Sequence, residues 1–211
     1  MVLNPRQRQK KTERRNAKQK ARRKDLVPHQ KGSLTAQLSD AARNPIVHCC
    51  ANSTLWEQGI GYVLLSRSIG SGSVAFAAFL VDVYCLGVKD VMFDISTRRQ
   101  YELQIYDKLM GQHLVTKLKP ECARKLVEGA VDFAHDAGLY PHPDYHKGKT
   151  LFGDIDATAC GERFEFGQDG KPFFVAGPYD NPGRCQQILR LLTERYGEDG
   201  FHCLLPVHPI N

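Results

Sequence analysis

The chain of 211 residues is 42% hydrophobic, which is enough for one packed core with appendages. Its net charge of +6 is unevenly distributed. Residues 1–31 hold 12 basic and two acidic residues, a net charge of +10, whereas residues 32–211 hold 17 basic and 21 acidic residues, a net charge of −4. The basic charge therefore belongs to an N-terminal arm of residues 1–31, and we expect one globular domain over residues 32–211.

The sequence has no membrane-spanning segment and no signal-peptide pattern. Its longest apolar run, residues 74–81, covers eight residues, whereas about 20 are needed to cross a bilayer. The seven cysteines form no C-x-x-C pair, and several lie in apolar surroundings, which is typical of reduced thiols. We therefore expect a soluble, cytoplasmic protein.

The N-terminal arm has nothing to bury, because Ala17 and Ala21 are its only apolar side chains between residues 4 and 25. Several of its basic residues recur at four-residue spacing, which favours a helix once counter-charges neutralise their repulsion. We assign the following residues to nucleic-acid binding: Arg6, Arg8, Lys10, Lys11, Arg14, Arg15, Lys18, Lys20, Arg22, Arg23 and Lys24.

Such an arm neutralises phosphate groups and releases counterions, which gives salt-dependent affinity for any nucleic acid. It contains no Phe, Tyr or Trp, so it supplies no stacking surface for single-stranded bases. The alternative is a targeting tail that an import receptor reads.

Residues 46–52 contain His48, Cys49 and Cys50, which raises the possibility of a metal site. Adjacent side chains of an extended segment point to opposite sides, so these three residues do not converge on one ion. A pair of buried, apolar cysteines is the alternative that we favour.

A β-hairpin is predicted by residues 61–68 and the segment that begins at Ser73, with a Gly/Ser turn between them. In the second strand every odd position from 75 to 85 is apolar, which indicates a fully covered face. Gly87 then permits a turn, and residues 91–95 form a third strand.

Asp82, Asp90 and Asp94 interrupt this apolar region, and carboxylates on neighbouring strands can hold Mg²⁺ for phosphoryl chemistry. On one continuous strand Asp82 and Asp90 would lie about 26 Å apart, at roughly 3.3 Å per residue. They can meet only if the chain turns at residues 86–88. Otherwise they are ordinary charged residues at strand ends.

Helices are predicted where apolar residues recur with helical spacing and a glycine or proline marks an end. The predicted helices cover residues 33–43, residues 98–110 before Gly111, residues 120–137 before Gly138, and the segment from Pro182 to Gly197.

Residues 140–156 hold further candidate metal ligands. His142 and His146 are four residues apart, as zinc-binding pairs on helices often are, and Asp154 and Asp156 could complete a site. Pro143 places His142 before any helix that follows, so the two rings need not share a face. A capped surface helix bounded by proline is the alternative.

The same segment interleaves aromatic and basic residues, as RNA-contacting loops do. The residues concerned are Tyr140, Tyr145, His146, Lys147 and Lys149. Beyond it, residues 163–166 and 173–176 flank a Gly-containing turn and predict a second hairpin, and residues 201–205 predict a last strand.

The order of these elements predicts an α+β fold in which a single mixed or mainly antiparallel sheet of about five or six strands is covered by helices. No phosphate-binding glycine loop, dinucleotide fingerprint, H-E-x-x-H or G-x-S-x-G motif occurs, and we assign no catalytic residue and no cofactor.

Three functions remain open from the sequence. The first is a soluble protein that associates with nucleic acid, RNA rather than DNA, through the arm. The second is a metal-dependent hydrolase or nuclease that uses some of the aspartates and histidines above with a divalent ion. The third is a protein-interaction domain whose arm is a targeting tail.

Overall fold

A computed structural model describes residues 33–70, 72–111, 114–177 and 180–205. The N-terminal arm, with every basic residue assigned to nucleic-acid binding, lies outside these ranges. The strands are β1 (Ile46–Asn52), β2 (Ile60–Ile69), β3 (Ser73–Asp82), β4 (Gly87–Thr97), β5 (Val115–Lys117), β6 (Phe173–Val175) and β7 (His202–Leu204). The α-helices are α2 (Leu34–Ala41), α3 (Leu55–Gln58), α4 (Arg98–Tyr101), α5 (Asp107–Leu109), α6 (Pro120–Asp136), α7 (Tyr145–Lys149) and α8 (Pro182–Tyr196), with shorter turns η1 (Glu102–Tyr106), η2 (Thr150–Phe152) and η3 (Ala157–Ala159).

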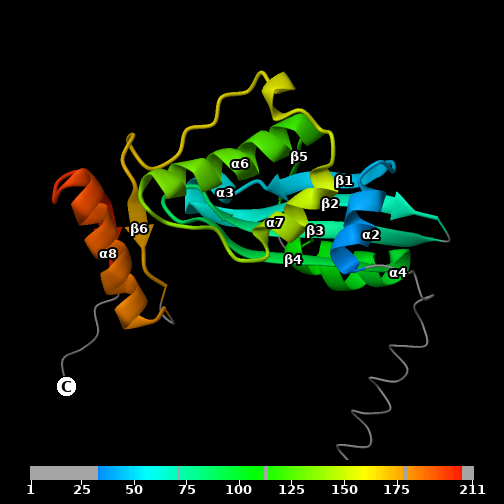
Figure 1. Ribbon diagram of the computed structural model, residues 1–211, viewed down its shortest axis with the longest axis horizontal. Coiled ribbons are helices and arrows are strands. Elements are labelled where there is room, and N and C mark those ends of the chain that lie inside the picture. The colour runs from blue at the N-terminus through cyan, green and yellow to red at the C-terminus, as the bar shows by residue number, and fades with distance from the viewer. Residues whose placement is uncertain (1–32, 71, 112–113, 178–179, 206–211) are drawn as a thin grey trace, which may run out of the picture. The chain divides into compact units, whose positions relative to one another are not determined.

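Five strands form an antiparallel sheet in the order β4-β3-β2-β1-β5 (Figure 1). The predicted hairpin is confirmed, since β2 and β3 pair continuously from Ile60 opposite Asp82 to Ile69 opposite Ser73. The sheet and its helices confirm the α+β class. Residues 46–52, treated as extended in the sequence analysis, form strand β1, whereas the edge strand β5 was not predicted.

One face of the sheet carries the largest core cluster. The odd positions of β3, from Ala75 to Val81, pack there against α2, α6, α7 and η2. Figure 1 shows α6 and α7 lying over this face. Because α6 turns its apolar stripe to the sheet, residues such as Leu126 and Ala130 are inaccessible to solvent.

The opposite face is covered by one continuous helical segment, α4, η1 and α5. Thr97 begins it with a reciprocal capping box with Gln100. The middle turn, Glu102–Tyr106, is π-helical. In a π-turn residues five apart come onto nearly the same side, so Tyr101 and Tyr106 both face His48 on β1, with ring centroids 5.6 and 4.2 Å from its ring.

The predicted turn near Gly87 is present. Residues 83–86 connect β3 to β4, and Gly87 begins β4 with φ +65°. A Cβ at this position would lie 2.8 Å from the carbonyl oxygen of Ala130 on α6, so the close approach of turn and helix requires glycine.

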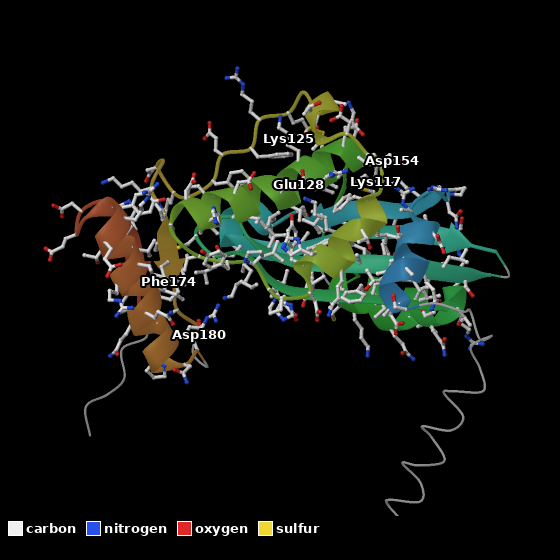
Figure 2. All side chains as sticks on the ribbon, viewed as in Figure 1. Lys117, Lys125, Glu128, Asp154, Phe174 and Asp180 are labelled. Atoms are coloured by element: carbon white, nitrogen blue, oxygen red, sulfur yellow. A yellow bond between two sulfur atoms is a disulfide. The ribbon has the colours of Figure 1, made fainter. Side chains whose placement is uncertain are left out.

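The turn of the predicted second hairpin is present, because Gln168 and Lys171 form an antiparallel bridge, but the predicted pairing of its two strands is wrong. Residues 163–166 form no strand, because Phe164 stacks on Trp56 and Phe166 stacks on Phe133. The strand β6 pairs in parallel with β7 instead of with residues 163–166. Phe174 of β6, labelled in Figure 2, forms a third buried cluster with Ile188 and Leu192 of α8 and with Leu86 of the β3–β4 turn.

The prediction that all cysteines are reduced thiols is also wrong. Cys122 on α6 and Cys160 form a disulfide, with Cα atoms 5.0 Å apart, whereas the other five cysteines are free. Lys125, labelled in Figure 2, donates hydrogen bonds to the carbonyl oxygens of Cys160 and Glu162 at 3.0 and 2.7 Å. The disulfide joins residues 38 positions apart, a spacing that carries no sequence signal. In the described part of the chain, no helix has the length and apolar character to cross a membrane.

Candidate functional site

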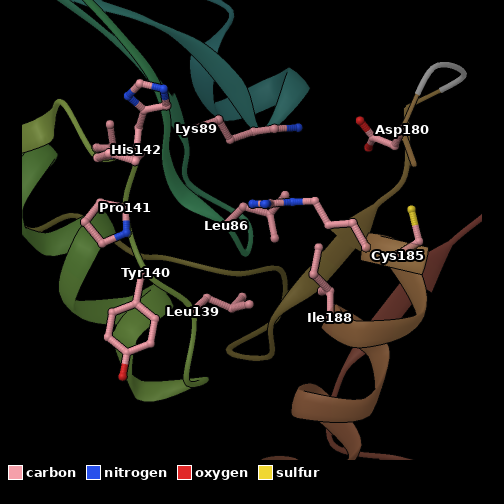
Figure 3. Close-up of a pocket in the computed structure, with 12 residues that line it drawn as sticks. Leu86, Lys89, Leu139, Tyr140, Pro141, His142, Asp180, Cys185 and Ile188 are labelled. Atoms are coloured by element: carbon pink, nitrogen blue, oxygen red, sulfur yellow. The ribbon is translucent and has the colours of Figure 1, made fainter. Parts of the chain in front are cut away.

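A pocket of about 450 Å³ lies between the start of β4, residues 139–143 and the first turns of α8. Its apolar wall includes Leu86, Leu139 and Ile188, and Figure 3 shows these three side chains gathered on one side of the space. Lys89 and Arg184 bring positive charge to the pocket. Its volume lies within the range of small-molecule sites, roughly 300–1,000 Å³.

The start of α8 positions Arg184 at this pocket. Asn181 caps the helix, because its Oδ1 accepts hydrogen bonds from the N–H groups of Gly183 and Arg184 at 2.9 and 3.2 Å. Pro182 occupies the first helical turn, where its missing N–H costs nothing. The Asn181 cap and Pro182 therefore define where α8 begins, and Arg184 lies in its first turn.

The segment that follows α6 forms the opposite wall. The N–H of His142 donates to the carbonyl oxygen of Val88 at 2.9 Å, which ties this segment to β4. The Nδ1 atom of His142 accepts a hydrogen bond from the N–H of Asp144 at 3.2 Å. In the neutral ring the hydrogen is therefore on Nε2, which lies 3.8 Å from Oδ1 of Asp90.

Neither of the two strong cations of the pocket is in close polar contact with a residue that the structure describes, although Lys89 is attracted by the buried Asp82 carboxylate. Neither Lys89 nor Arg184 forms an ion pair or a side-chain hydrogen bond there. Figure 3 shows the Lys89 side chain extending toward Asp180, but no ion pair joins them, and Oδ2 of Asp180 accepts a hydrogen bond from the N–H of Gly177. The pocket thus combines an apolar wall with two cations and one carboxylate, Asp180, and neither cation is joined to that carboxylate by an ion pair.

Asp82 and Asp90 lie on the neighbouring strands β3 and β4, but their carboxylates accept hydrogen bonds from different backbone groups. Asp90 lies opposite Leu80, two residues before Asp82. The buried Asp82 carboxylate accepts hydrogen bonds from the N–H groups of Tyr84 and Cys85 at 3.0 and 2.8 Å, so it holds the β3–β4 turn. Burial raises the pKa of Asp82, and these hydrogen bonds oppose the shift in part.

The four proposed metal ligands of residues 140–156 also have separate environments. His142 lies before α7 and His146 within it, as the prolines predicted. Asp156 caps η3 by accepting hydrogen bonds from the N–H and the hydroxyl of Thr158, and Asp154 is exposed (Figure 2). Among the described residues, no three His, Cys, Asp or Glu side chains are grouped so that they could hold a metal ion.

The third candidate group, on β1, separates in the same way. Cys49 and Cys50 pack on opposite faces of the sheet, as expected for adjacent residues of a strand. Burial raises the pKa of Cys49 to about 12 and that of Cys50 to about 11, so both stay as thiols at neutral pH. His48 instead forms a hydrogen bond with the hydroxyl of Tyr101 at 2.9 Å.

Neither Arg184 nor Lys89 was identified as a site residue from the sequence. The predicted helix that begins at Pro182 places Arg184 in its first turn. Nothing in the sequence places that turn beside β4, about 95 residues earlier in the chain. Comparisons with protein-family models, curated proteins and solved structures find no match to this chain.

Proposed function

We propose that this protein associates with nucleic acid, with RNA favoured over DNA, and that its basic N-terminal arm is the anchor. The observation that carries the proposal is the separation of charge, with a net +10 in residues 1–31 and −4 in the remaining residues. A phosphate backbone is attracted to the arm and repelled by the average surface of the domain.

Two features of the folded domain support a contact with RNA beyond the arm. The cations Lys89 and Arg184 line a pocket, and neither forms an ion pair with a residue that the structure describes. Tyr140, at the same pocket, is 75% exposed and offers a ring to an unpaired base. Unpaired bases are common in RNA loops and rare in duplex DNA, and this favours RNA.

The test compares RNA and DNA binding of the full chain with that of a chain that begins at Gly32, across a series of salt concentrations. On single strands the logarithm of the affinity falls with the logarithm of salt by about 0.7 per phosphate contacted. We expect the shortened chain to bind more weakly and with a much flatter salt dependence.

A second form of the test keeps the chain length, by replacing the eleven basic residues that we assign to binding with glutamine. Arg190→Gln is the matched control, because Arg190 is an exposed cation on α8, paired with Glu194 at 3.6 Å and remote from the arm in sequence. If both changes to the arm leave the affinity and the salt dependence as they were, the arm is not the anchor and the proposal is wrong.

A further inference from the structure

We infer that the pocket beside α8 binds one nucleotide of single-stranded RNA, with the phosphate at Lys89 and Arg184 and the base against the apolar wall. This inference rests on the proposed function, and it names the part of the RNA that the folded domain would bind. The argument comes from charge complementarity, from the composition of the wall and from the placement of Tyr140.

The cations argue for a phosphate. Lys89 is half-buried on the edge strand β4, and Arg184 comes from α8, so two rigid elements present positive charge to one space. Lys89 is attracted by Asp82 but forms no ion pair or hydrogen bond through its side chain among the described residues, and Arg184 is exposed, so both can contact a ligand. An anion between these two side chains would interact with both positive charges, and arginine can bind phosphate through two parallel hydrogen bonds.

The wall argues for a flat, mostly apolar group joined to that phosphate. Leu86 and Ile188 are buried residues of the third core cluster, and Leu139 packs against it. Together with the nearby cations they favour a ligand that has a ring at one end and an anion at the other, which is the chemistry of a nucleotide.

The strand must be single-stranded for the base to enter. Bases of a duplex are stacked and paired, whereas an unpaired base can turn outward and pack on protein side chains. Tyr140 stands at the edge of the pocket with three quarters of its surface exposed, and its ring contacts His135 with centroids 5.5 Å apart. It can stack on the base of a neighbouring nucleotide.

The test measures binding of adenosine monophosphate, uridine monophosphate, adenosine and inorganic phosphate to the full chain by calorimetry, in salt high enough to suppress non-specific binding by the arm. We expect both monophosphates to bind more tightly than adenosine or phosphate alone. Lys89→Gln and Arg184→Gln should each weaken monophosphate binding about tenfold and leave adenosine binding within about twofold. Arg190→Gln, on the same helix, should change neither.

An oligonucleotide separates the ring contacts from the phosphate contacts. Tyr140→Ala should weaken the binding of a single-stranded RNA by about tenfold, the size of one stacking contact, and leave the monophosphates unaffected. The inference is overturned if the monophosphates bind no better than inorganic phosphate, or if Lys89→Gln and Arg184→Gln change nothing. A phosphotyrosine peptide that binds as tightly as the RNA would overturn it as well.

The two proposals fail in different ways. If pocket variants have no effect while the chain beginning at Gly32 loses its salt-dependent affinity for RNA, the nucleotide pocket is wrong and the function stands. If removal of the arm changes nothing, the anchor is wrong whatever the monophosphates do.

Discussion

Two regions of this protein hold polar side chains against apolar surroundings, and they differ in whether those side chains are satisfied. The first, which we call the polar core, consists of Asn52, Ser66 and Arg67 on β1 and β2, each at most 6% exposed. The second is the pocket beside α8, with Lys89 and Arg184.

In the polar core the side chains are bonded within the protein. Arg67 donates to the carbonyl oxygens of Asn44, Leu151 and Phe152, at 2.7 to 3.3 Å. Asn52 accepts from the N–H of Tyr62 and donates to the carbonyl oxygen of Leu109. These groups use their hydrogen-bonding capacity mainly within the protein, and they stabilise the fold.

Ser66 belongs to a shorter network of the same kind. Its Oγ accepts hydrogen bonds from the N–H of His48 and the hydroxyl of Tyr101, at 3.0 and 2.9 Å. Since that hydroxyl gives its hydrogen to Ser66, it accepts one from Nδ1 of His48. The comparison teaches that burial of a polar group does not by itself indicate a site. The useful signal is a polar group that the protein leaves without a partner.

The largest expected effect comes from Arg67→Met, which keeps much of the apolar volume and removes all three hydrogen bonds. Three carbonyl groups then lose a charged donor, and we expect the free energy of unfolding to fall by about 3 kcal/mol or more. Urea unfolding measures it. A loss below about 1 kcal/mol would show that water replaces the guanidinium and that the polar core is less tightly closed than described.

A smaller loss of stability is expected for Tyr101→Phe, which leaves Ser66 and His48 without their shared hydroxyl partner. We expect a loss of about 1–2 kcal/mol. Tyr140→Phe makes the same chemical change on a side chain that is 75% exposed, and it should cost less than about 0.5 kcal/mol. Equal losses in the two variants would contradict the assignment of the Tyr101 hydroxyl to a buried network.

The pH dependence of stability tests His48 in the same network. Burial, followed by the positive charge of Arg98, lowers the pKa of His48 below its ordinary value of 6.5, against a smaller opposing effect of Glu102. The unfolded chain therefore binds this proton more readily, and stability should decrease as the pH falls from 6.5 toward the folded-state pKa. His48→Gln should remove that part of the pH dependence, as unfolding at a series of pH values from 8 to 5 would show. An unchanged dependence would mean that His48 titrates normally.

The sequence was sufficient where the structure is local. The apolar alternation of β3, the stripe of α6 and the Asn-Pro start of α8 each predicted their element, because each pattern lies within one continuous segment. Gly87 was correctly identified as a turn residue, although its close contact with Ala130 was not visible.

Predictions that needed a partner elsewhere in the chain were less successful. Residues 163–166 have the aromatic pattern of a strand, but their two phenylalanine rings stack on Trp56 and Phe133 and the segment pairs with no strand. The Cys122–Cys160 disulfide and the approach of Arg184 to Lys89 likewise join distant segments. The acidic candidates were selected by residue type and position along the chain, which do not reveal hydrogen-bond partners, and Asp82 and Asp156 both proved to be bonded to the backbone.

The smallest expected effect on stability completes the comparison. Lys89→Gln and Arg184→Gln remove charges that contact no partner among the described residues, so each should change the free energy of unfolding by less than about 0.5 kcal/mol. If either variant loses as much free energy of unfolding as Arg67→Met, the side chain stabilises the fold and is not available to a ligand. Unchanged stability together with weakened nucleotide binding would show that Lys89 and Arg184 act in ligand binding, whereas the polar core acts in stability.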